Sequence, residues 1–119
     1  MHAVLFAALL ATASPAPASE LEYASGSLAY EALVNGDLAL AEQQLAASQS
    51  ANRQDGAWLL NYGQLLARQG RVNEAREVFR RIARAPDSEV VLASGEVIGT
   101  REASRLAARR MTQQSLTAR

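Results

Sequence analysis

Few side chains in this 119-residue sequence could carry out catalysis. The only histidine is His2, inside an apolar N-terminal run, and cysteine and lysine are absent. Candidate nucleophiles and general bases are therefore reduced to serines and carboxylates. No serine lies in a Gly-x-Ser-x-Gly motif, which would expose it on a sharp turn. The residue inventory predicts a protein that is not an enzyme.

Metal and cofactor sites have equally little support in the sequence. The carboxylates are scattered, and the spacing of Glu74 and Glu77 is more typical of a solvated helix face than of a metal site. Without cysteine there are no thiolate ligands and no disulfides. We therefore expect neither a metal nor a cofactor.

Arginines at four-residue spacing form a clear charged pattern. Arg101, Arg105 and Arg109 would share one face of a helix, with Arg110 beside them. Such a stripe could bind phosphate or an acidic partner, but it lacks interleaved aromatic residues and any nucleic-acid-binding motif. We therefore expect no nucleic acid. The simpler interpretations are a solvated face or a docking surface for the acidic N-terminal half.

The 12 basic and 12 acidic residues are separated along the chain. Up to Leu60 the only cation is Arg53, whereas arginine predominates after Asn61. This separation favours self-association, with a homodimer as one form, or an asymmetric groove. Ordinary solvated helix faces would produce it as well.

An apolar run over residues 3–13 is followed by Ser-Pro-Ala-Pro-Ala and then by polar residues. This order is typical of a secretory signal peptide, and the run is shorter than the roughly 20 residues that span a bilayer. We predict a signal peptide over residues 1–18 and a periplasmic or secreted protein that meets the membrane only through that peptide. Because basic residues are missing before the run, a cytoplasmic protein with a frayed N-terminus or an interfacial anchor is the alternative.

After Glu20, apolar residues recur at helical spacing on both sides of Gly36 and of Gly70. Glycine suits the left-handed turn that ends a helix, and Asp37 or Asn73 nearby can cap the next helix. Each glycine therefore marks the turn of a helical hairpin. The two hairpins superpose without a gap at a shift of 34 residues: Leu28 on Tyr62, Ala29 on Gly63, Ala32 on Leu66, Gly36 on Gly70, Leu38 on Val72, Ala41 on Ala75 and Leu45 on Phe79.

This pattern resembles the tetratricopeptide repeat family, whose unit is a helix-turn-helix of about 34 residues. In the second copy the small residues Gly63 and Ala75 lie where its two helices should approach most closely. The first copy is more polar, with Ser25 and Ser48 at positions of large residues, as expected for a terminal repeat. The resemblance implies two repeats within residues 19–86, at about 22–55 and 56–89, stacked as an α-α superhelix. An unrelated four-helix bundle is the alternative.

Residues 87–119 differ in composition from the repeats. β-Branched residues on both sides of residues 93–96 predict a β-hairpin. Such a hairpin is marginal alone, so it must pack on the last repeat helix, on the following segment or on another subunit. A helical pattern then runs from Thr100, as N-cap, to about Gln114 and would serve as a capping helix. The predicted fold is mainly α: two tetratricopeptide-like hairpins, a short β-hairpin and a C-terminal capping helix.

In the family, first-helix residues line a peptide-binding groove, and the resemblance carries this role to both copies. Asn61 matches an asparagine with which some members hold a peptide backbone or carboxylate, although the accompanying lysines are missing. Alternatively, the hairpin or the last helix fills the groove as structure. The residues expected to contact a peptide are Tyr23 and Tyr30 from the first helix of copy one, and Leu60, Asn61, Gln64 and Arg68 from copy two, with Ser27 and Ala57 beside them.

These features predict a small exported bacterial protein that acts as a non-catalytic protein–protein interaction module. It would be an adaptor or assembly factor that binds a peptide or protein segment in the repeat groove. The alternative is an intracellular regulatory module whose arginine-rich C-terminal helix binds an anionic partner.

We predict that signal-peptide cleavage after Ala18 gives a mature chain that begins Ser19-Glu20-Leu21. Mass spectrometry of the N-terminal peptide from the envelope fraction measures this directly. Recovery of intact Met1 on protein from the cytosol would contradict it.

Overall fold

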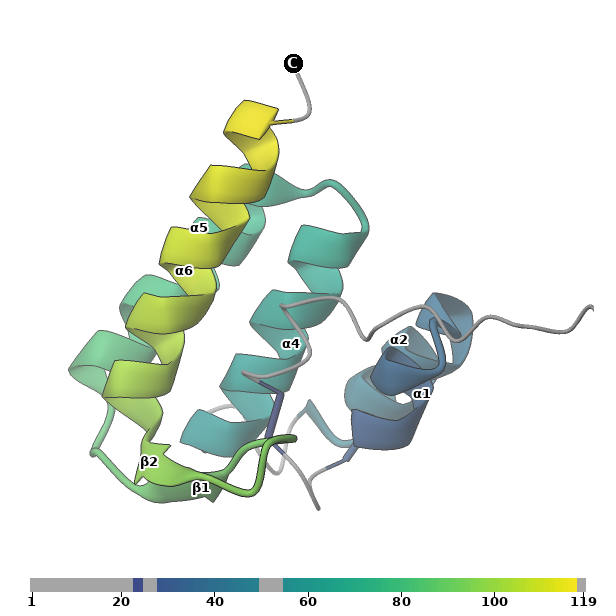
Figure 1. Cartoon of the computed structure of the whole chain (residues 1–119). Helices are drawn as coiled ribbons and strands as arrows, with labels where there is room; N and C mark the ends of the chain where they lie inside the picture. Colours follow the sequence, from purple (N-terminus) through teal and green to yellow (C-terminus); the bar gives the residue numbers. More distant parts are fainter. Residues whose placement is uncertain (1–22, 25–27, 50–54, 118–119) are drawn as a thin grey trace, which may run out of the picture.

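The computed structural model describes residues 23–24, 28–49 and 55–117. Within these residues the chain is mainly helical, with five helices and one pair of antiparallel strands (Figure 1). The predicted signal peptide and Ser27 lie outside the described residues, and none of the described helices is long and apolar enough to cross a membrane. The elements are α1 (Tyr30–Val34), α2 (Leu38–Ala47), α4 (Gly56–Arg68), α5 (Val72–Arg84), β1 (Glu89–Val91), β2 (Val97–Gly99) and α6 (Thr100–Thr117).

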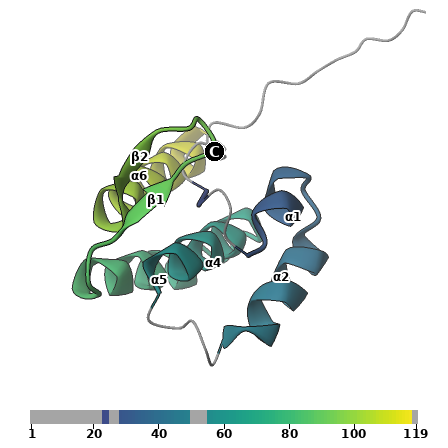
Figure 2. The same ribbon diagram turned by 90° about the horizontal axis from the view of Figure 1, so that it is seen from below.

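Helix α4 lies at the centre of the molecule (Figures 1 and 2). Helices α5 and α6 pack on one side of it, and α1 and α2 lie on the other. The β1–β2 hairpin lies at one end of the α4, α5 and α6 bundle (Figure 1). Because α4 has neighbours on both sides, its buried side chains include Trp58, Leu59, Leu60, Leu65 and Leu66.

The turn from α1 to α2 and the turn from α4 to α5 have the same backbone geometry. Gly36 and Gly70 adopt left-handed φ angles of 77° and 80°, as their positions in the sequence predicted. In each turn the glycine N–H donates to the carbonyl three residues back, at 3.1 Å and 3.0 Å respectively. The next N–H donates to the carbonyl five residues back, at 2.8 Å and 2.9 Å. The two hydrogen-bond patterns therefore coincide at the repeat shift.

The two predicted helix caps had different outcomes. Asp37 caps α2 by accepting a hydrogen bond from the Leu40 N–H at 3.1 Å, which confirms the first prediction. Asn73 lies inside α5, whose N-cap residue is Arg71, so the second prediction is wrong.

Helices α4 and α5 approach each other closely at Gly63. A Cβ atom at this position would lie 2.5 Å from Cε1 of the Phe79 ring, far inside normal carbon–carbon contact. Phe79 and Ala75 are buried between the helices. The prediction that a small residue is needed at position 63 is confirmed.

The first helical pair is shorter than the repeat pattern predicted. Helix α1 has 5 residues against 13 in α4, and Ala29, just before α1, has a left-handed φ of 73° that interrupts a right-handed helix. The prediction that Tyr23 lies on the first helix is wrong, because Tyr23 and Ala24 lie outside every described helix. The backbone N–H and carbonyl of Ala24 instead bond to the side chain of Asn61, so they cannot enter a helical ladder.

The predicted β-hairpin is present, with Val90 of β1 paired to Ile98 of β2. Val90 and Leu92 are buried. Ile98 of β2 packs against the hydrophobic core of the same chain, to which Val90 and Leu92 belong. The hairpin also meets Ala24, which forms an isolated antiparallel bridge with Leu92.

Helix α6 starts at the expected place, but Thr100 is its first residue and not the N-cap before it, and the helix continues to Thr117, beyond the expected end at Gln114. Its first turn is held by Asp87, whose carboxylate accepts from the Arg101 N–H at 3.1 Å and from the Thr100 hydroxyl at 3.2 Å. The hydrogen bond from the Arg101 N–H is the main reason that the pKa of Asp87 lies below its ordinary value. The carboxylate also lies at the positive end of the helix dipole, which strengthens the cap.

We predict that Phe79→Ala lowers the free energy of unfolding by about 3 to 5 kcal/mol, because it leaves a cavity beside Gly63. Gly63→Ala should lower it as well, through the clash with the ring. Denaturant midpoints measure both effects, and the exposed Gln43→Ala is the control. Equal midpoints for Phe79→Ala and Gln43→Ala would show that the ring does not hold the two helices together.

Candidate functional site

Asn61 of α4 is fully buried and binds the backbone of the chain's own N-terminal segment. Its Oδ1 accepts from the Ala24 N–H at 2.8 Å, and its Nδ2 donates to the Ala24 carbonyl at 3.2 Å. The same Nδ2 donates to the Leu28 carbonyl, also at 3.2 Å. A single amide therefore binds both backbone groups of one residue, which a carboxamide can do because it carries both a donor and an acceptor.

Arg68, two turns further along α4, binds the residue before Ala24. Its Nη1 donates to the phenol oxygen of Tyr23 at 2.5 Å and to the Leu33 carbonyl at 3.0 Å. Leu33 belongs to the last turn of α1. Arg68 therefore joins the Tyr23 ring, α1 and α4.

The β-hairpin closes the site from a third direction. Ala24 pairs with Leu92 just beyond β1, and Figure 2 shows the Tyr23–Ala24 piece, in purple, between β1 and α4. Tyr23 and Ala24 have exposed fractions of only 0% and 1%. We call the space that Tyr23 and Ala24 fill the cleft. It is defined by their direct partners Asn61, Arg68 and Leu92, and by Leu28 and Leu33, whose carbonyls accept from Asn61 and Arg68.

The structure brings three of the predicted peptide-contacting residues, Tyr23, Asn61 and Arg68, into one cluster. It does not present them as an open groove. Tyr23 is part of the filling, Asn61 is enclosed and Arg68 is half-buried, so these three side chains do not line a free surface. The other predicted residues are Leu60 and Gln64, both buried on α4, and Tyr30, half-buried on α1. Contact of any of these residues with a partner stays a prediction.

Sequence reasoning missed Leu28, Leu33 and Leu92 because they act through their backbones. A carbonyl that accepts a hydrogen bond leaves no signature in residue type. The alternative in which the hairpin fills the groove is the nearest to the observed arrangement. The hairpin supplies a wall through Leu92, and Tyr23 and Ala24 supply the filling.

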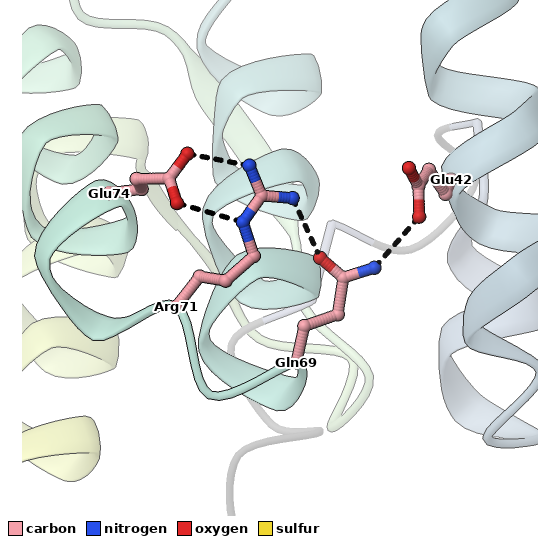
Figure 3. Close-up of polar contacts among 4 residues, drawn as sticks. All are labelled: Glu42, Gln69, Arg71 and Glu74. Carbon is pink, nitrogen blue, oxygen red and sulfur yellow. Dashed lines mark hydrogen bonds and ion pairs between the residues drawn. The ribbon is translucent and has the colours of Figure 1, made fainter.

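A second hollow, with a volume of about 170 Å³, lies between α2 and α4. Polar contacts link the two sides at its rim (Figure 3): Gln69 donates to Glu42 of α2 at 2.9 Å and accepts from Arg71 at 3.3 Å. Arg71 also pairs with Glu74 at 2.6 Å, and this hydrogen bond lowers the pKa of Glu74. Such an exposed pair adds little stability. These rim contacts all join side chains, whereas Asn61 in the cleft binds main chain, so the hollow is a weaker candidate for a peptide site than the cleft.

The arginine stripe lies on an exposed face of α6, where Arg101, Arg105 and Arg109 are all solvent-accessible. Arg101 has a structural role, because its Nη2 donates to the Ala85 carbonyl at the end of α5, at 2.9 Å. The stripe therefore offers an anionic partner two arginines, Arg105 and Arg109, whose side chains are exposed.

Within residues 23–24, 28–49 and 55–117, no three histidine, cysteine, aspartate or glutamate side chains gather where they could hold a metal ion. Comparisons of the chain with protein-family models, with curated proteins and with solved structures found no match. The description of the cleft therefore rests on the structure of this chain alone.

We predict that Asn61→Ala lowers the free energy of unfolding by about 1 to 3 kcal/mol, because it leaves buried backbone groups of Ala24 and Leu28 without their partner. The sequence alone predicts that Asn61 lines a groove, so that its replacement would leave the free energy of unfolding unchanged. The matched control is Asn73→Ala on α5, which removes only an exposed contact with Arg76 at 3.4 Å. Equal thermal unfolding curves for the two variants would contradict the role of Asn61.

Proposed function

We propose that the protein is a non-catalytic protein–protein interaction module, an adaptor or assembly factor, whose cleft binds an extended segment of a partner. The main support is the pair of hydrogen bonds between Asn61 and the backbone of Ala24. These bonds recognise main chain, so the same groups suit the main chain of a partner. Arg68 beside them adds recognition of one side chain.

We also propose that the two helical pairs are tetratricopeptide-like repeats. The matching hydrogen bonds of the two turns, at a shift of 34 residues, support this assignment. So does the close contact of Gly63 with Phe79 at the positions where repeat helices approach. In this reading the first repeat is a shortened terminal unit, whose missing first-helix turns are replaced beside α4 by Tyr23 and Ala24.

The proposed location is the periplasm of a bacterium, or the medium outside the cell, because residues 1–18 have the sequence of a signal peptide. The partner is then an exported or envelope protein with an extended segment. Two short repeats form a small interface, so the affinity should be modest, micromolar or weaker.

The test is a selection of random 10-residue peptides on the immobilised full chain, followed by titration of the enriched peptides. Arg68→Met removes the guanidinium of the cleft, and Arg105→Met makes the same change on the exposed face of α6. Both changes are made in the variant Tyr23→Ala, in which the chain's own phenol no longer binds Arg68. We predict that Arg68→Met then weakens peptide binding about tenfold or more, the range for loss of a charge-assisted hydrogen bond, and that Arg105→Met leaves it unchanged.

Circular dichroism of both variants checks that they are folded. Loss of binding with Arg105→Met but not with Arg68→Met would contradict the proposal and favour the arginine-rich helix as the binding surface.

A further inference from the structure

The cleft is saturated by the chain's own residues. Asn61 binds both backbone groups of Ala24, Arg68 binds the phenol of Tyr23, and Leu92 pairs with Ala24. Among the described residues, no buried side-chain nitrogen or oxygen lacks a hydrogen-bond partner. A partner segment can therefore enter the cleft only by displacing Tyr23 and Ala24.

We infer that Tyr23 and Ala24 are an internal competitor for the cleft, and that the partner segment carries the same chemistry, a tyrosine followed by a small residue in an extended conformation. This inference rests on the proposed peptide-binding function and adds the class of ligand and its regulation. A partner segment must therefore bind the cleft more favourably than Tyr23 and Ala24 do.

Tyrosine is specified by its hydroxyl group. The Tyr23 ring is fully buried, and its oxygen accepts from Arg68. A phenylalanine in its place would fill the same space and leave that donor without the phenol. Loss of one hydrogen-bonding group at a buried site discriminates more strongly than the loss of a methylene group.

A small residue is specified by the enclosure of Ala24. It is 1% exposed, between Asn61 of α4 and Leu92 of the hairpin. A larger side chain would have to push these two elements apart, which is costly in a packed interior. The cleft should therefore select segments in which a tyrosine is followed by a small residue.

The competition can be estimated from effective concentration. A segment tethered by a short linker reaches a local concentration of about 1 mM. If the untethered segment would bind the cleft with a Kd of about 10 to 100 μM, the tethered segment weakens the binding of an external peptide by roughly tenfold to a hundredfold.

The test uses a fluorescent peptide with the sequence of residues 19–28, SELEYASGSL, titrated into the full chain and into the full-length variant Tyr23→Ala. Tyr23→Ala weakens the internal competitor and keeps Asn61, Arg68 and Leu92. We expect the peptide to bind the variant roughly tenfold to a hundredfold more tightly than the wild type. Peptides with Phe or Ala in place of the tyrosine should bind the variant more weakly than the tyrosine peptide does.

The outcomes separate this inference from the proposed function. Equal binding of the peptide to both proteins, or equal binding of its Tyr and Phe forms, overturns the internal competitor and its tyrosine chemistry but leaves peptide binding standing. No binding by either protein of this peptide or of any peptide from the random selection overturns both.

A second variant keeps the test decisive if Tyr23→Ala does not fold. The chain has no cysteine, and residues opposite each other in an antiparallel bridge have Cα separations that suit a disulfide. In the variant Ala24→Cys with Leu92→Cys, oxidation should fix the segment in the cleft and weaken peptide binding at least tenfold, and reduction should restore it. Binding that is the same in the oxidised and reduced forms overturns the inference.

Discussion

The hydrogen bonds between Asn61 and the backbones of Ala24 and Leu28 fix how the N-terminal part of the chain lies on α4. A buried carboxamide without partners would cost about 1 to 3 kcal/mol, so this side chain favours only arrangements that bring backbone groups to it. Arg68 extends the same contact to α1 through the Leu33 carbonyl. The position of the first helical pair on α4 therefore depends on this polar contact together with the burial of Leu33, Ala41 and Leu45. The packing of α5 on α4 depends on apolar contact at Phe79.

Elements set by local sequence could be predicted. Gly36 and Gly70 end their helices because only glycine adopts the required left-handed conformation without strain. Gly63 lies opposite Phe79 at the position that the repeat pattern indicates. The β-hairpin follows from β-branched residues on both sides of a turn, all within a few positions of one another. The start of α6 also depends on Asp87, which lies 13 positions before Thr100.

The filling of the cleft could not be predicted in this way, because it joins residues that are far apart in the sequence. Asn61 binds Ala24 across 37 positions, and Arg68 binds Tyr23 across 45. The repeat pattern placed Tyr23 on a helix, since the second copy is helical at the equivalent position. One signal opposed this: the residues that follow, Ser25, Gly26 and Ser27, have poor helix propensity. Propensity therefore argued against a helix at Tyr23, but it gave no indication of what would bind Tyr23 and Ala24 instead.

The same contacts that hold the fold together would also decide what the cleft binds. A partner that replaced Tyr23 and Ala24 with identical groups would exchange one set of hydrogen bonds for another, so those bonds alone would contribute almost no net free energy. Displacement must then come from additional contacts on either side of the two residues, or from a high local concentration of the partner. A segment that lacks the phenol or carries a larger second residue would fit worse than the internal one and be excluded. The selectivity of the cleft would therefore arise from competition, because every candidate ligand must displace Tyr23 and Ala24.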